Sequence, residues 1–208
     1  MKNIIKLFVF LVKLPNFIIQ LFIFFSKSDC SLLNYKIKPM LFDKKNKEPF
    51  DPHYLYHTAW AMRVLNKTKP QVHYDFSSDL RFVTMLSAYT KVVQYNLSIP
   101  TVKLDNLIFE KQDLTKMLDI KDDSLESISC MHVVEHIGLG RYGDKIDPLG
   151  NIKAINELKR ILSKNGNLLF VTPVGKSKIV FNAHRISSYD EVIKQFSGLK
   201  LLENICRM

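Results

Sequence analysis

The residues best suited to chemistry lie between positions 124 and 143, in the string SLESISCMHVVEHIGLGRYG. It contains His132-x-x-Glu135-His136, so two imidazoles and one carboxylate fall within five positions. The pattern matches that of the inverzincin proteases, but a zinc site needs it on one continuous helix with a third ligand. Here the motif directly follows an apolar strand, and Gly138 cuts any helix short. We therefore interpret His132 or His136 as a general base, with zinc proteolysis as a distant alternative and no metal expected.

A second group of polar residues lies at the first predicted turn. Asp75 stands near the end of an apolar strand, and Ser77 and Ser78 open the helix that follows. The free N–H groups at a helix start suit carboxylates and phosphates, and a nucleotide-like cofactor often lies beside them. The same residues also fit a capped helix that binds no ligand.

Two further strand ends carry candidate ligands. The second strand ends at Tyr95-Asn96, where the amide oxygen of Asn96 can accept one hydrogen bond from a ribose hydroxyl. The third strand is followed by Asp113-Leu114. The Asp113 carboxylate could accept from an adenine amino group or simply cap the next turn.

A later loop, 181–187, combines an amide, an imidazole and a guanidinium in Asn182, His184 and Arg185. These groups could bind a polar or anionic acceptor. A solvated loop that caps the next helix is the equal alternative.

Apolar runs and helical periodicity alternate from residue 50 onward, which predicts a doubly wound, mostly parallel α/β sheet. The first predicted helix runs from His53 to Asn66, with Leu55, Ala59 and Met62 on one face. A later helix should end at Asn165-Gly166. Ligands of such sheets bind at the carboxyl ends of the strands. The predicted strands are 71–76, 91–96, 106–110, 124–130, 167–172 and 199–204.

The order of these motifs resembles that of class I S-adenosylmethionine (SAM) methyltransferases, which have a Rossmann-like fold. Three strings, CMHVVEHIGLGRYGDKIDP, NLLFVTPVGK and FNAHRISS, look more specifically like the domain-of-unknown-function family 268 (DUF268). The resemblance covers roughly residues 40–204. That family is similar to methyltransferases and is often found in bacterial surface-polysaccharide clusters, which implies methylation of a sugar or lipid-linked glycan.

The resemblance also implies roles for individual residues. SAM would be held by Asp75, Ser77, Ser78, Tyr95, Asn96, Asp113, Leu114, Cys130 and Met131, with His132 at the end of the same segment. The acceptor would face Glu135, His136, Arg141, Tyr142, Asn182, His184 and Arg185.

Three features depart from the usual methyltransferase pattern. Serines replace the glycines of the first turn, Asn96 replaces an acidic residue, and the chain stops near the sixth strand, before the usual last one. These departures motivate a second hypothesis, a non-catalytic methyltransferase-like module that binds a protein partner at an exposed sheet edge.

The N-terminal segment has a separate character. In residues 4–25, which are strongly apolar, Lys13 and Pro15 interrupt the run, and Lys13 at the centre of a spanning helix would cost ~3 kcal/mol. Lys2, Lys6, Lys13, Asn16, Gln20 and Lys27 fall on one face of a helix, which Pro15 should divide into two pieces. We expect an amphipathic helix at 1–28 on an anionic membrane surface, a basic linker at 29–50 and a methyltransferase-like domain at 51–208. Docking on the protein's own core and a true membrane span remain alternatives.

The distribution of charge and cysteine limits the location and partners. Residues 1–48 carry +6 of the net charge of +10, so the positive charge lies beside the apolar segment rather than along the folded domain. This distribution favours membrane over nucleic acid as the partner. Three scattered cysteines argue against a disulfide framework. We expect a cytoplasmic protein, peripheral on the inner face of the membrane.

Overall fold

The computed structural model describes residues 2–27, 36–41, 50–117 and 119–205, with the backbone alone for 2–9. The chain divides into two units, Met1–Asp51 and Pro52–Met208. Most of the basic linker predicted at 29–50 lies outside the described residues.

In the described part of the first unit there is one helix, α1 (Lys2–Ser26), which continues through Pro15. The two helical pieces expected from the proline are therefore one element. A proline removes one helical hydrogen bond, and α1 continues past this loss without ending. Within the described part of the chain, no helix has both the length and the apolarity needed to cross a membrane.

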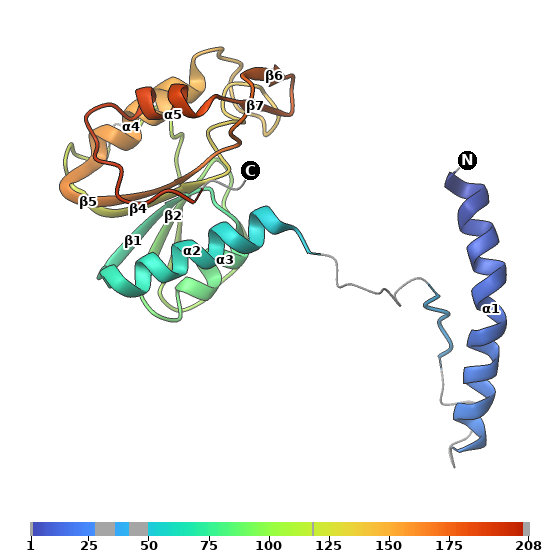
Figure 1. The fold of residues 1–208 in the computed structure, drawn as a ribbon. Coiled ribbons are helices and arrows are strands. Elements are labelled where there is room, and N and C mark those ends of the chain that lie inside the picture. Colours follow the sequence, from blue (N-terminus) through green and yellow to red (C-terminus); the bar gives the residue numbers. More distant parts are fainter. Residues whose placement is uncertain (1, 28–35, 42–49, 118, 206–208) are drawn as a thin grey trace. The chain divides into compact units, whose positions relative to one another are not determined.

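The second unit is built on a sheet of five parallel strands in the order β3-β2-β1-β4-β5 (Figure 1). The chain moves outward from β1 to β3, then returns to the other side of β1 for β4 and β5. This reversal opens a crevice beyond the carboxyl ends of β1 and β4. The strands are β1 (Val72–Phe76), β2 (Lys91–Asn96), β3 (Leu107–Lys111), β4 (Leu125–Met131) and β5 (Leu162–Val171).

Helices cover both faces of this sheet (Figure 1). One face carries α2 (Pro52–Thr68) and α3 (Leu80–Leu86), and the other carries α4 (Gly150–Ile161) and α5 (Tyr189–Gln195). The predicted doubly wound, Rossmann-like α/β fold is thus confirmed, because both the strand order and the two helical layers are present.

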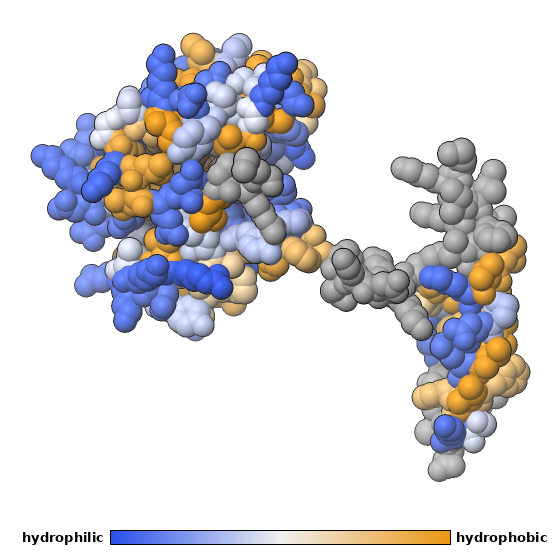
Figure 2. Space-filling model, in the orientation of Figure 1, coloured by the Kyte–Doolittle hydropathy of each residue, from blue (hydrophilic) through white to orange (hydrophobic). Residues whose placement is uncertain are grey.

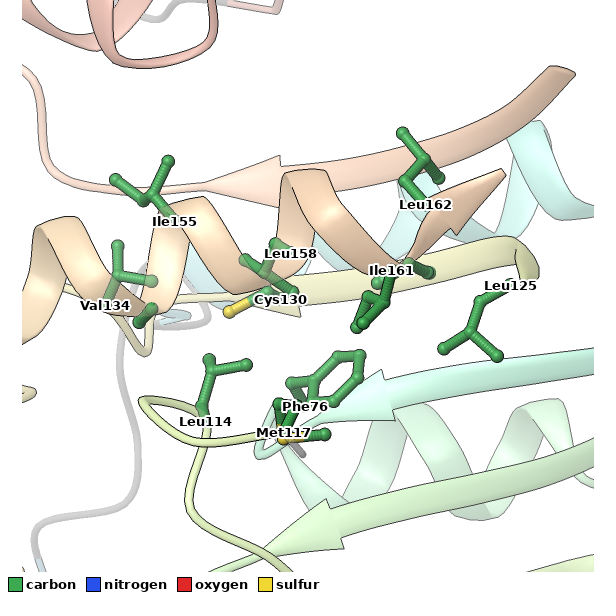
Figure 3. Packing of buried hydrophobic residues seen from close by; sticks show 12 residues of the cluster. Phe76, Leu114, Met117, Leu125, Cys130, Val134, Ile155, Leu158, Ile161 and Leu162 are labelled. Carbon is green, nitrogen blue, oxygen red and sulfur yellow. The ribbon is translucent and has the colours of Figure 1, made fainter. Parts of the chain in front are cut away.

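Apolar side chains join the sheet to α4 in one buried cluster (Figure 3). Ile155 and Leu158 of α4 pack over β4, and Phe76 at the end of β1 lies below them. The Cys130 side chain is fully buried in this cluster. A neighbouring cluster, which includes Ala61 of α2, fills the opposite face.

Two local expectations were wrong, and one pair of strands was not predicted. The buried face of α2 is formed by His57, Ala61 and Leu65, whereas Leu55 is 52% exposed. The strand predicted at 199–204 is not formed, since residues 200–205 are irregular. An antiparallel pair that was not predicted, β6 (Lys178–Val180) and β7 (His184–Ile186), precedes α5.

Gly166 also has a different role from the expected helix end. Helix α4 ends at Ile161, and β5 begins at the next residue. A Cβ on Gly166 would lie 2.9 Å from the Leu125 carbonyl oxygen. The glycine therefore permits close approach of β5 to β4, where the register shifts between Leu125 and Ser127.

Candidate functional site

A cavity of about 500 Å³ lies at the carboxyl ends of β1 to β4. The strand order brings these ends together, although their residues are far apart in the sequence. Ten of the predicted site residues line the cavity: Ser77, Ser78, Tyr95, Asn96, Asp113, Leu114, Met131, His132, His136 and Tyr142.

The turn after β1 achieves a glycine-like conformation without a glycine. Ser77 has a φ of 57°, in the left-handed region, and its N–H and hydroxyl both donate to the Tyr95 carbonyl oxygen at 3.0 Å. Ser78 is buried, and its hydroxyl accepts from the Met131 N–H at 3.1 Å. These bonds hold the first turn against β2 and β4 and offset the conformational cost of the left-handed serine.

Asp75 is buried beneath the cavity and does not line it. Its carboxylate accepts from the Ser78 N–H at 2.9 Å, from Gln94 Nε2 at 2.7 Å and from the Ser129 hydroxyl. Burial raises the pKa of this carboxyl, although these hydrogen bonds oppose the rise. The predicted cofactor ligand is therefore placed as a support for the turn at 77–78.

Asn96 is the last residue of β2, and Asp113 follows shortly after the end of β3. The Asn96 amide nitrogen is buried and has no hydrogen-bond partner among the described residues. The Asp113 carboxylate accepts from the Thr115 N–H at 2.9 Å and from its hydroxyl at 2.7 Å, both through Oδ1. The buried amide donor of Asn96 requires an acceptor, which a ligand in the cavity would supply.

The motif after β4 forms a turn and not a helix, so its two histidines do not share one helix face. His132 has a left-handed φ of 58°, and its Nδ1 lies 3.0 Å from Glu135 Oε1. His136 Nδ1 donates to the Ala183 carbonyl oxygen at 2.6 Å, and its Nε2 lies 3.9 Å from the same Glu135 oxygen. No group of histidine, cysteine or acidic side chains in the described residues is arranged to hold a metal ion.

Glu135 lies behind the cavity lining and not within it. Its side chain is 2% exposed, and Oε2 has no hydrogen-bond partner among the described residues. A carboxylate that accepts from His132 Nδ1–H leaves the unprotonated Nε2 as the nitrogen that can take a proton. The arrangement therefore suits a general base supported by a carboxylate.

Of the other predicted acceptor residues, Tyr142 alone lines the cavity, and it is 61% exposed. Arg141 is exposed and donates to the Ala183 carbonyl oxygen at 3.1 Å. Asn182 is exposed outside the cavity, while the His184 ring lies 6.5 Å from that of His136.

Arg185 and Cys130 do not line the cavity. Arg185 is buried and donates to the carbonyl oxygens of Ile137 at 2.5 Å and Pro148 at 3.4 Å, and burial lowers the pKa of its guanidinium. It ties β7 to the loop before α4. The Cys130 side chain points into the core among residues such as Leu158, because alternate residues of β4 face opposite sides of the sheet.

Sequence reasoning missed the part of the site that α2 supplies. Tyr54 lines the cavity, and the rings of Tyr54 and His57 lie 5.7 and 5.0 Å from that of His132. The His57 ring nitrogen Nδ1 lies 2.5 Å from the His53 carbonyl oxygen, and burial lowers the pKa of His57. The spacing of His53 and His57, four residues apart, was the available signal.

The loop between the motif and α4 closes one side of the cavity. Asp144 accepts from the backbone N–H groups of Gly138 at 2.6 Å, Gly140 at 3.2 Å and Tyr142 at 3.2 Å. Burial alone would raise the pKa of the Asp144 carboxyl, but these donors bring the pKa below its usual value. Gly138 has a φ of 80°, and a Cβ there would lie 2.0 Å from the Asp147 carbonyl oxygen.

The strand order and this cavity define a doubly wound α/β protein with a small-molecule site at the point where the strand order reverses. More specifically, the chain belongs to the family described as Caenorhabditis protein of unknown function, DUF268, whose sequence profile matches residues 80–205. A comparison with curated proteins finds no match.

The solved structures that are similar to this chain include two methyltransferases. One is Burkholderia thailandensis 1,6-didemethyltoxoflavin-N1-methyltransferase, solved with 1,6-didemethyltoxoflavin and S-adenosylhomocysteine bound, with a TM-score of 0.49 and 10% identity over 72% of this chain and 79% of that one. The other is a SAM-dependent methyltransferase from Archaeoglobus fulgidus, with a TM-score of 0.46 and 14% identity over 69% of this chain and 71% of that one.

Proposed function

We propose that the second unit is a SAM-dependent methyltransferase acting on a small polar acceptor. One observation carries the proposal: the ends of four successive strands bring Ser77, Asn96, Asp113 and His132 to one cavity. Its volume of about 500 Å³ lies within the usual range for small-molecule sites, roughly 300–1,000 Å³.

The lining fits a nucleoside cofactor. The buried Asn96 amide offers a donor without a partner among the described residues, and Asp113 offers a carboxylate that is exposed to the cavity. Leu114 and Met131 supply apolar walls on which a planar base can lie. SAM, when bound at such a site, supplies a methyl group on a positively charged sulfur.

The contribution of this chain to transfer is orientation and proton removal. The carbon–sulfur bond of SAM would break as the acceptor's hydroxyl oxygen bonds to the methyl carbon, leaving S-adenosylhomocysteine, and His132 would accept the hydroxyl proton at Nε2. Glu135, whose Oε1 lies 3.0 Å from His132 Nδ1, holds the ring and stabilises the imidazolium. The side chains of Tyr54 and His57 from α2 limit the access of water to His132.

We further infer that the acceptor is a sugar or a lipid-linked glycan. The sequence resemblance to a family found beside polysaccharide genes supports this class. At the cavity mouth, Tyr54 is 40% exposed and Tyr142 is 61% exposed, and the charged residues Asp144 and Lys145 lie on the same lining. Exposed rings among polar groups suit a ligand with both apolar and hydroxylated faces.

Calorimetric titration of the full chain with SAM and with S-adenosylhomocysteine tests the proposal. We expect binding in the micromolar range, and the substitution Asp113→Ala should weaken it at least ~10-fold, because a charge-assisted hydrogen bond is worth about 1.5–3 kcal/mol. Asp119→Ala, an exposed acidic residue outside the cavity lining, is the control. A folded chain that binds neither compound would contradict the proposal.

That contrary result would favour the second candidate, a non-catalytic module that binds a protein partner. The supporting observation is the end of the sheet at β5, which pairs with β4 alone among the described strands. Apolar side chains are also exposed after α5, where Leu201 and Leu202 are 58% and 72% exposed. An unpaired strand edge can add a strand from another chain.

A further inference from the structure

Helix α1 has a charge of one sign only. Residues 1–28 contain four lysines and no acidic residue. Since an α-helix turns by about 100° per residue, Lys13, Asn16 and Gln20 fall on one side of α1. The positions of Lys2, Lys6 and Lys27 follow the same period.

Much of the remaining helix surface is apolar and exposed in the described part. Leu11, Val12 and Ile19 are 59%, 62% and 57% exposed, and Phe22 is 72% exposed. Figure 2 shows hydrophobic residues exposed along the described part of α1. So large an exposed apolar surface is unusual for a helix surrounded by water and indicates a binding surface.

We propose that α1 binds the anionic surface of a lipid bilayer and lies in its interfacial plane. The lysine stripe would face the lipid phosphates, and Phe22 and its apolar neighbours would enter the acyl region. Charge selects this occupant over a second copy of the chain, because two such helices would bring lysines together without any acidic partner in residues 1–28.

The polar residues of α1 favour a helix that lies in the membrane interface over one that spans the bilayer. Lys13 stands at the middle of α1, and Asn16 and Gln20 follow on the same side. In a spanning orientation all three would enter the hydrocarbon core, where charged and polar groups are costly. In the interfacial orientation the whole stripe stays with water and headgroups. The proposal concerns α1 alone and does not depend on methyl transfer.

Flotation of the full chain with preformed vesicles tests the proposal. We expect it to float with vesicles of phosphatidylcholine containing about 30% phosphatidylserine, at least ~10-fold more strongly than with phosphatidylcholine alone, since each surface lysine adds to the attraction. This preference should fall at high salt, because salt screens exposed charges. Alkaline carbonate should release the bound protein.

Two substitutions distinguish membrane binding through the apolar side of α1 from nonspecific adsorption through any exposed apolar residue. Phe22→Asp should reduce flotation at least ~10-fold, because it places a charge on the apolar side. Phe181→Asp is the matched control, since Phe181 has the same 72% exposure but lies in the second unit, and it should float as the native chain does. Three results would overturn the proposal: no flotation, equal flotation with both lipids, or resistance to carbonate, which would indicate a spanning helix. A soluble oligomer that does not float would assign α1 to self-association.

Discussion

At the residue scale, the environment of Glu135 is the most demanding in the site. Its carboxylate is 2% exposed, and one oxygen has no partner among the described residues. Burying a carboxylate without a full set of hydrogen-bond partners costs folding free energy, which suggests that Glu135 has a role in the site. The two imidazoles of His132 and His136 are within 3.0 and 3.9 Å of its other oxygen. We therefore assign Glu135 as the positioning residue for His132 and no longer as an acceptor ligand.

The first prediction concerns the proton on His132. In the native chain Glu135 should hold that proton on Nδ1, so Nε2 faces a ligand as an acceptor. Glu135→Gln can offer its amide N–H to Nδ1 and should move the proton to Nε2. Nitrogen NMR of the imidazole rings in the full chain would distinguish the two tautomers.

The same variant should bind SAM with unchanged affinity, because Glu135 does not line the cavity. Glu126→Gln, an exposed substitution on β4, is the control and should leave the His132 tautomer unchanged. An unaltered His132 tautomer in Glu135→Gln would refute the assignment of Glu135.

At the element scale, the loop between β4 and α4 determines where His136 and the cavity wall lie. Asp144 fastens this loop by accepting from Gly138 and Gly140, and the Gly138 carbonyl in turn accepts from the Asp147 N–H at 3.0 Å. The loop thus depends on close backbone contact at Gly138 in addition to the buried side chain of Leu139.

The second prediction uses two glycines of this loop as a matched pair. Both Gly138 and Gly143 have a φ of 80°, but a Cβ at Gly143 meets nothing within 4 Å, whereas at Gly138 it lies 2.0 Å from Asp147 O. Gly143→Ala should lose about 1 kcal/mol of unfolding free energy through backbone strain alone. Gly138→Ala should lose at least ~2–3 kcal/mol and also weaken SAM binding, because Asp147 must move. Urea denaturation and titration measure both effects, and equal losses from the two variants would contradict this account.

The central elements were predictable because their patterns are strong. Short apolar runs such as 91–96 have the length and composition of buried parallel strands, and β2 occupies those residues. By contrast, β6 has no buried residue, so periodicity could not mark it. The apolar face assigned to α2 failed because its first two turns lie beside the site, where His57 takes the buried position.

The site itself was partly predictable for a topological reason. Residues that follow parallel strands meet at one edge of the sheet, so Ser77, Asn96 and Asp113 could be grouped without knowing distances. The placements of Cys130 and Arg185 required the side-chain directions of β4 and β7, which depend on packing. The contribution of Tyr54 required the position of α2 across the sheet, which the sequence did not indicate.

At the scale of the whole molecule, a buried polar row runs through the middle of the sheet. Asp75 on β1 pairs in register with Gln94 on β2 and with Ser129 on β4. Its carboxylate accepts a hydrogen bond from each of these two side chains. His73 extends the row, with its ring nitrogens 2.7 and 2.9 Å from the hydroxyls of Ser127 and Ser129. Because three strands share this row, a change in its protonation should change the free energy of unfolding of the whole domain.

The third prediction is that acid destabilises the fold through His73. Burial lowers the pKa of His73 to about 3, whereas the unfolded value is 6.5. Between these values the unfolded chain binds one more proton than the folded chain, so stability is fully present above pH 6.5 and is lost as the pH falls. The loss should be ~1.4 kcal/mol per pH unit, or ~2 kcal/mol from pH 6.5 to pH 5.

The raised pKa of Asp75 acts in the opposite direction, but His73→Gln retains Asp75 and can still hydrogen-bond to the serines. Urea denaturation of both proteins over this range should therefore give a steeper loss for the native chain, while parallel curves would show that His73 does not titrate with unfolding.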